Sequence, residues 1–221
     1  MKLNQRGPLK THEVMGDDNK PVVILFHGYG ADAFDLAPLA DVTPGLQDWT
    51  WIFPQGPSEV PIGPGWTGRA WWPIDLEKIS TSRDLSSENP QELPEVRKKV
   101  LSLIATLKRP WSEIVLGGFS QGGMVAADVA LHAPENPRNL LLLSTALINK
   151  TEWSTVANQR KGLRFFQAHG NQDTVIDIKN GQRLESFLTG QGLTGKLRQF
   201  SGGHEIPSLV LQDMGNFLST T

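Results

Sequence analysis

The sequence contains no cysteine, which excludes a disulfide framework, a thiolate-bound metal and a cysteine nucleophile. Long hydrophobic runs are also missing, because the longest wholly apolar stretches, such as 22–26 and 140–143, are far shorter than the ~18 residues of a membrane span. The first residues lack the apolar stretch of a secretory signal. We therefore expect a soluble, cytoplasmic protein with no integral membrane association.

An excess of basic charge is absent as well, since 21 Lys and Arg residues face 23 Asp and Glu residues and the formal net charge is −2. A chain without such an excess has little to neutralise a row of phosphates, so no nucleic-acid partner is expected. Hydrophobic residues make up 38% of the chain, and its 22 Gly residues bring the apolar share to that of globular proteins. The 221 residues predict one domain, 1–221, with a sizeable core.

Apolar runs of strand length alternate with segments of helical periodicity, which is typical of a mostly parallel sheet with helices on both faces. The predicted strands are 21–27, 50–54, 113–119, 139–145, 163–169 and 195–200. The predicted helices are 32–41, 91–108, 121–133, 179–188 and 207–218. Together these elements predict an α/β fold.

Residues 54–94 break this alternation, because they are rich in Gly and Pro and hold three of the seven Trp residues. Segments of this length inside a compact domain are usually functional or disordered. Since Trp66, Trp71 and Trp72 do not suit a disordered linker, we expect an irregular excursion that shapes a binding site. The alternative is a surface excursion whose Trp side chains cover the edge of the sheet.

The pentapeptide Gly118-Phe-Ser120-Gln-Gly122 matches G-x-S-x-G between a predicted strand and a predicted helix. This is the setting of a nucleophile elbow, in which a sharp turn presents the serine at the N-terminus of the helix. Free N–H groups there favour developing negative charge. The alternative is a serine that merely caps the helix. We predict that Ser120 is a catalytic nucleophile.

A serine hydroxyl needs a base to take its proton and an acid to orient that base. His204, in the Gly-rich loop before the last helix, fits the chain order Ser, then Asp or Glu, then His. Asp173 follows a strand end, where α/β sheets gather reactive groups, and is the predicted acid. Asp177 is the second choice, because it fits a helix cap better. His169 is then structural and holds the turn that presents Asp173.

An acyl-transfer enzyme also needs backbone N–H groups that stabilise the oxyanion. The residue after the nucleophile, Gln121, and the His-Gly loop after the first core strand, at Tyr29, are the predicted donors. The same loop matches a dinucleotide-binding pattern, G-x-G-x-x-A, but the next strand ends without the acidic residue that holds a ribose. No metal motif is present. We expect neither a metal nor a cofactor.

The segments LFHGYGAD, GFSQGG, HGNQD and GGHEIP, taken in this order, resemble the small carboxylesterase and acyl-protein thioesterase family of α/β hydrolases, also called the phospholipase/carboxylesterase family. The resemblance runs from about Pro21 to the last helix and implies the α/β-hydrolase fold with a minimal lid. It also implies the triad and oxyanion donors given above. The family's Trp-aromatic segment is similar to 70–75, which implies that Trp71 and Trp72 bind substrate. Two positions depart from the family: Tyr29 stands where members often have Leu, and Pro73 interrupts the Trp-rich segment.

We therefore expect a serine carboxylesterase that hydrolyses small esters with short or medium acyl chains through an acyl-serine intermediate. A thioesterase for lipidated proteins, or a lysophospholipase, is the alternative and needs a long apolar channel. A non-enzymatic binding module is a third reading, against which the retained Ser, acid and base argue. The expected partner is a small-molecule ester, and a homodimer is left open.

Overall fold

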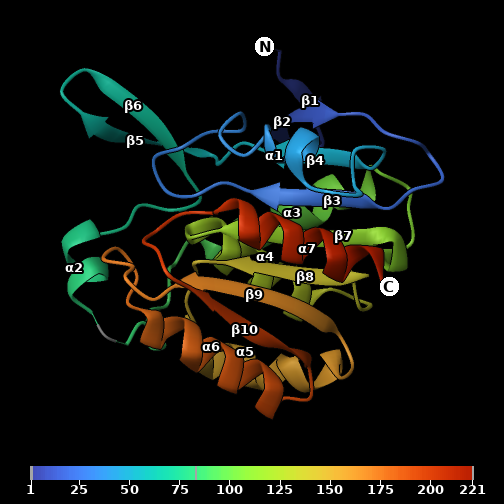
Figure 1. Ribbon diagram of the computed structural model, residues 1–221. Helices are drawn as coiled ribbons and strands as arrows, with labels where there is room; N and C mark the ends of the chain where they lie inside the picture. The colour runs from blue at the N-terminus through green and yellow to red at the C-terminus, as the bar shows by residue number, and fades with distance from the viewer. Residues whose placement is uncertain (1, 83, 221) are drawn as a thin grey trace.

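The computed structural model describes residues 2–82 and 84–220, and its centre is an eight-stranded sheet (Figure 1). In the order in which they lie side by side, the strands are β1 (Asn4–Arg6), β2 (Leu9–Val14), β4 (Thr50–Pro54), β3 (Val22–Phe26), β7 (Ile114–Phe119), β8 (Asn139–Leu143), β9 (Arg164–Gly170) and β10 (Thr194–Phe200). From β4 to β10 all pairs are parallel, while β1 and β2 pair antiparallel at one edge. The fold is therefore a mostly parallel α/β sheet, as the sequence predicts.

Helices cover both faces of this sheet. They are α1 (Leu39–Val42), α2 (Leu76–Thr81), α3 (Leu93–Ala105), α4 (Gln121–His132), α5 (Lys150–Val156), α6 (Ile178–Gly190) and α7 (Ser208–Ser219), with short 3-10 turns at Trp111–Glu113 and Ala157–Arg160. Side chains of α3, α4, α5 and α6 form one buried cluster with one face of the sheet. Those of α1 and α7 form a second cluster on the opposite face. None of the helices in the described part of the chain reaches the length and hydrophobicity of a membrane span.

The helix predicted at 32–41 is wrong for most of its length, because only Leu39–Val42 is helical. Before it the chain forms successive turns with N–H to C=O bonds over three residues, as from Ala37 to Phe34. Pro38 has no N–H to donate to the carbonyl of Phe34, and the Asp32 carboxylate accepts the N–H of Phe34 at 2.8 Å. These local bonds replace a helix.

The predicted irregular segment 54–94 is partly regular. It contains a hairpin of β5 (Ser58–Gly63) and β6 (Trp66–Ala70), which projects from the body beside the sheet, followed by α2 (Figure 1). The hairpin pairs with the loop after β3, since Gly30 donates to the carbonyl of Arg69 and Arg69 donates to Ala31, both at 2.8 Å. The excursion thus holds the loop that carries Tyr29.

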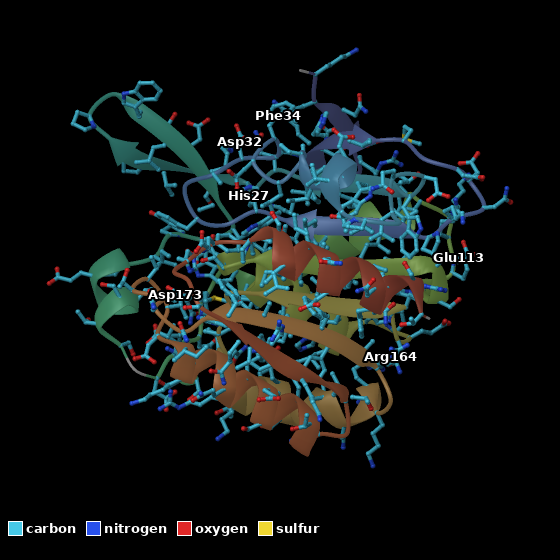
Figure 2. The ribbon with its side chains drawn as sticks, in the orientation of Figure 1. His27, Asp32, Phe34, Glu113, Arg164 and Asp173 are labelled. Carbon is cyan, nitrogen blue, oxygen red and sulfur yellow. The ribbon has the colours of Figure 1, made fainter. Side chains whose placement is uncertain are left out.

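The carboxyl ends of the parallel strands meet on one side of the molecule. Figure 2 shows His27 and Asp173 there, after β3 and β9, and Glu113 and Arg164 at the opposite side, where β7 and β9 begin. This arrangement brings segments that are distant in sequence to one edge, where α/β folds place their sites.

Candidate active site

Ser120 lies in a strained turn between β7 and α4. Its backbone has φ 55° and ψ −120°, a conformation that is unfavourable for any residue with a side chain. The Ser120 N–H donates to the carbonyl of Leu143 at 2.8 Å, and the Thr145 hydroxyl donates to the carbonyl of Ser120 at 2.8 Å. The turn also requires glycine at 122, because a Cβ there would lie 2.0 Å from the carbonyl oxygen of Phe26. This is the geometry that the G-x-S-x-G motif predicts.

His204 and Asp173 form a hydrogen-bonded pair. Nδ1 of His204 lies 2.7 Å from Oδ2 of Asp173, and the Asp173 side chain is completely buried while that of His204 is 16% exposed. The ring of Phe119 packs against that of His204 with centroids 4.6 Å apart. Because Nδ1 is engaged by the carboxylate, Nε2 is the nitrogen left to accept a proton from a serine.

The Asp173 carboxylate is held by further hydrogen bonds. Its Oδ1 accepts the N–H groups of Val175 and Ile176, each at 2.8 Å. Nε2 of His169 lies 2.8 Å from the carbonyl of Ile176 and 3.2 Å from Oδ2 of Asp173. Burial alone would raise the pKa of Asp173, but the hydrogen bonds from His169, His204 and the backbone outweigh it and lower that pKa below its usual range. Asp173 is thus an anion that orients His204, and His169 supports its turn.

The second-choice acid, Asp177, lies elsewhere in this turn. Its side chain accepts the N–H of Lys179 at 2.8 Å and so caps the N-terminus of α6. This is the alternative role that the sequence gives it.

The predicted oxyanion donors, Tyr29 and Gln121, come from two different segments. Tyr29 follows β3, and Gln121 is the first residue of α4, whose N–H has no partner within the helix. Among the residues that the structure describes, neither N–H group has a hydrogen-bond acceptor. Both residues line the same cavity as Ser120. Two unsatisfied donors beside a serine can stabilise a tetrahedral oxyanion.

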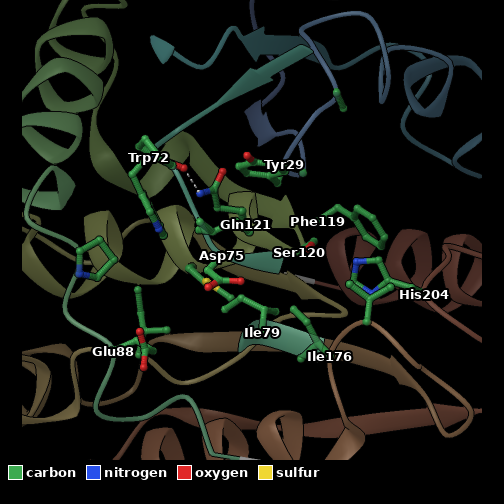
Figure 3. A pocket seen from close by; sticks show the side chains of 18 of the residues that line it. Tyr29, Trp72, Asp75, Ile79, Glu88, Phe119, Ser120, Gln121, Ile176 and His204 are labelled. Atoms are coloured by element: carbon green, nitrogen blue, oxygen red, sulfur yellow. Dashed lines mark hydrogen bonds between the residues drawn. The ribbon is translucent and has the colours of Figure 1, made fainter. Parts of the chain in front are cut away.

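A cavity of about 330 Å³ contains these groups. Figure 3 shows Ser120, His204, Tyr29 and Gln121 around it. Its apolar lining includes Trp72, Ile74, Ile79, Met124, Ile148 and Ile176. Four acidic residues, Asp35, Asp75, Glu88 and Glu92, also line it, and no Lys or Arg does so within 2–82 and 84–220. The carboxylates make the cavity unfavourable for an anionic group, and the apolar side chains can contact an apolar one.

Much of this lining was not identified individually from the sequence. Residues of 72–92 form one wall, which agrees with the expectation that the excursion shapes a site. That wall is tied to the body, because Leu85 donates to Oδ1 of Asn180 at 3.0 Å and Asn149 donates to the carbonyl of Glu88 at 2.7 Å. Met124 and Ile148 carry no sequence signal that separates a cavity residue from a core residue.

Trp71 does not occupy the position that the sequence predicts for it. Trp72 lines the cavity as expected, but Trp71 is 0% exposed and does not line it. Its ring packs edge-on against Phe26, with centroids 5.2 Å apart at 90°. The chain bends at Trp71 and Trp72, directly after β6, and this bend places the two adjacent side chains in different surroundings. The assignment of Trp71 to substrate binding is therefore wrong.

His27 is buried beneath the Tyr29 loop. Its Nδ1 lies 2.7 Å from the carbonyl oxygen of Gly28, and its Nε2 accepts the N–H of Gly56 at 2.9 Å. Because Nε2 accepts, the proton of the neutral ring is on Nδ1 and is donated to Gly28. Burial lowers the pKa of His27 to about 4. The imidazole is therefore neutral at physiological pH.

The buried His27 predicts a pH-dependent stability. Between about pH 6.5, the usual His pKa, and pH 4 the unfolded chain binds a proton that the folded chain does not. The free energy of unfolding should therefore fall by about 3 kcal/mol as the pH drops through this window. Above about pH 6.5 the contribution of His27 to stability does not change with pH. Urea unfolding across this range measures it. His27→Asn keeps a donor near Gly28 but cannot titrate, so the unfolding free energy of this variant should depend less steeply on pH. If its pH dependence equals that of the parent protein, groups other than His27 cause the effect.

Metal chemistry has no evident site in the described residues, where no group of three or more His, Asp or Glu side chains could hold an ion. The pattern at 28–33 that matches a dinucleotide fingerprint is followed by turns and not by a helix. A pyrophosphate would have no helix N-terminus there.

Comparison with known proteins shows the family to which the chain belongs. A family model described as Phospholipase/Carboxylesterase matches residues 12–221. Acyl-protein thioesterase 1 of Mycosarcoma maydis is 31% identical over 183 residues, which cover 76% of each protein. Acyl-protein thioesterase 1 of Cryptococcus neoformans is 30% identical over 173 residues, 75% of this chain and 71% of that protein.

Solved structures show the same fold. The crystal structure of esterase PE8 superposes with a TM-score of 0.81 at 24% identity, covering 96% of this chain and 98% of that one. The Bacillus cereus carboxylesterase has a TM-score of 0.76 at 19% identity, covering 96% and 94%. With the matching family model, these likenesses establish an α/β-hydrolase fold. The chain belongs to the phospholipase/carboxylesterase family of hydrolases.

Proposed function

We propose that this protein is a serine hydrolase of carboxylic esters with uncharged acyl groups of short to medium length. The observation that carries this proposal is the cavity shared by Ser120, at its strained turn, and His204, which is bonded to Asp173. In the proposed reaction Oγ of Ser120 attacks the ester carbonyl carbon while Nε2 of His204 takes the hydroxyl proton. The N–H groups of Tyr29 and Gln121 stabilise the oxyanion.

The second half of the reaction regenerates the enzyme. Collapse of the tetrahedral intermediate breaks the bond to the leaving alcohol, which receives the proton from His204 and departs. A water molecule then gives a proton to His204 and attacks the acyl-Ser120 carbonyl. The acid leaves, and Ser120 recovers its proton. Besides the ester and water, the proposed steps use only side chains and main-chain N–H groups of this chain.

The cavity supports the choice of acyl group. Its volume of about 330 Å³ is at the lower end of the 300–1,000 Å³ typical of ligand pockets, which favours short and medium chains. The carboxylates that line the cavity disfavour an anionic acyl group. One of them, Asp35, has a raised pKa because it is partly buried and lies near the negative charge of Asp32. The relatives named acyl-protein thioesterase 1 support the second candidate, a thioesterase for long acyl chains on proteins.

A series of acyl chain lengths separates these two candidates. We expect kcat/KM for p-nitrophenyl esters to rise from acetyl to hexanoyl or octanoyl and to fall at least tenfold at hexadecanoyl, because the longest chain exceeds the cavity. The ratio of kcat/KM between octanoyl and hexadecanoyl thioesters gives the chain-length preference for substrates with a sulfur leaving group. An adipoyl monoester, which carries a terminal carboxylate, is the charged control and should be hydrolysed more slowly than the hexanoyl ester. Turnover that increases steeply up to hexadecanoyl would favour the thioesterase.

A further inference from the structure

An oxyanion hole works only if its two N–H groups are held at a fixed separation. Here the donors belong to the loop after β3 and to the first residue of α4, so the local chain geometry does not set their distance. A residue bonded to both segments, through its main chain to one and its side chain to the other, could set this distance. Trp71, which does not touch the cavity, is bonded to both.

Trp71 reaches the α4 side through Gln121. The main-chain N–H of Trp71 donates to Oε1 of Gln121 at 3.0 Å. Nε2 of Gln121 donates to the carbonyl of Trp72 at 2.8 Å, the bond that Figure 3 draws as a dashed line. Gln121 is 1% exposed. Both polar atoms of its side-chain amide are therefore bonded to the Trp segment, while its own N–H is the proposed oxyanion donor.

Trp71 reaches the other donor through His27. Its indole N–H donates to the carbonyl of His27 at 2.9 Å, and the His27 ring in turn donates to the carbonyl of Gly28. The peptide between Gly28 and Tyr29 is trans, so its carbonyl and its N–H lie on opposite sides. Because His27 holds the carbonyl, the N–H of Tyr29 is directed away from the imidazole.

The side chain of Trp71 is enclosed by other residues. The side chain is completely buried, and its ring contacts those of Phe26, edge-on, and His27, with centroids 5.3 Å apart. Breaking the indole hydrogen bond would leave the carbonyl of His27 without that donor in a buried site.

We propose that Trp71 is a positioning residue that sets the separation of the two oxyanion N–H groups by bonding to the segments that carry them. The proposal rests on the proposed function of Ser120. Trp71 itself touches no substrate. Its loss should therefore weaken binding of the tetrahedral transition state and not of the ground-state ester.

The test is Trp71→Phe, which removes the indole N–H and keeps an aromatic ring. We expect kcat for p-nitrophenyl butanoate to fall about tenfold or more, with KM within twofold, because a displaced donor costs less than the 10²–10³-fold of a deleted one. The inhibition constant of a trifluoromethyl ketone, which forms a tetrahedral adduct with serine, should rise by a similar factor. Site-specific 3-benzothienylalanine at position 71 replaces the N–H by sulfur at nearly constant shape and should have the same effect if the phenylalanine variant does not fold.

Trp51→Phe is the matched control. Trp51 is also 0% exposed and donates its indole N–H to a backbone carbonyl, that of Leu46, at 3.2 Å, but it does not line the cavity. The Trp51→Phe protein should be less stable than the parent protein but should keep the parent's kcat. Unchanged kcat and inhibition constant at position 71, or an equal loss of kcat at position 51, would overturn the proposal. Full activity of Ser120→Ala would instead overturn the proposed function.

Discussion

Ser120→Ala is expected to lower kcat for p-nitrophenyl hexanoate by at least about 10⁴-fold while leaving the protein folded. The substitution removes only the hydroxyl that forms the acyl intermediate. The strained backbone at φ 55° is kept in place by bonds to Leu143 and Thr145, which alanine does not disturb. Stopped-flow or steady-state release of p-nitrophenol measures the loss, and circular dichroism with thermal unfolding confirms the fold.

Double substitution gives an internal control for this result. If Ser120 and His204 act as one unit, adding His204→Ala to Ser120→Ala should cost little more than Ser120→Ala alone. Multiplicative losses would show that the two residues act independently and that His204 is not the base for Ser120. Near-normal turnover by the Ser120→Ala protein would remove the acyl-serine mechanism altogether.

Asp173→Asn is expected to reduce kcat by about 10⁴-fold, as for the orienting carboxylate of other serine triads. Asparagine can still accept the N–H groups of Val175 and Ile176, which fixes its oxygen and turns its NH₂ toward His204. Nδ1 of His204 must then accept, so the proton moves to Nε2, the nitrogen that should take it from Ser120. The hydroxyl is left without a base.

Asp177→Asn is the matched control for Asp173, since both carboxylates belong to the same stretch between β9 and α6. Asp177 caps α6 through Lys179, and asparagine caps helices about as well as aspartate. We expect kcat within twofold of the parent protein and a change in unfolding free energy below about 1 kcal/mol. The reverse pattern, with activity lost at 177 and kept at 173, would make Asp177 the orienting acid.

The sequence predicted the elements that carry a strong local signal. The buried apolar strands β3, β4, β7, β8, β9 and β10 and the helices α3, α4, α6 and α7 lie within a few residues of their expected positions. The sequence singles out Ser120, Asp173 and His204 because each follows a strand end in a recognisable turn. Parallel topology brings strand ends to one edge, which agrees with the common position of these three residues, while their catalytic roles stay predictions.

What the sequence did not predict depends on tertiary contacts. The turns at 32–38 replace a helix because Pro38 and the Asp32 carboxylate alter the local bonding, although the apolar spacing favours a helix. Trp71 and Trp72 are chemically identical neighbours, and only the path of the folded chain decides which of them faces the cavity. The hairpin of β5 and β6 is stabilised in part by its bonds to the loop after β3, which no local pattern reveals.

If Ser120 is an activated nucleophile, it should react with electrophiles that label serine hydrolases, so covalent labelling is a direct test of its role. A fluorophosphonate probe should modify the protein once per chain, and peptide mass spectrometry should locate the adduct on Ser120. The adduct should be absent from Ser120→Ala and form far more slowly in Asp173→Asn. An adduct on another residue, or none under conditions in which the protein hydrolyses esters, would contradict the account.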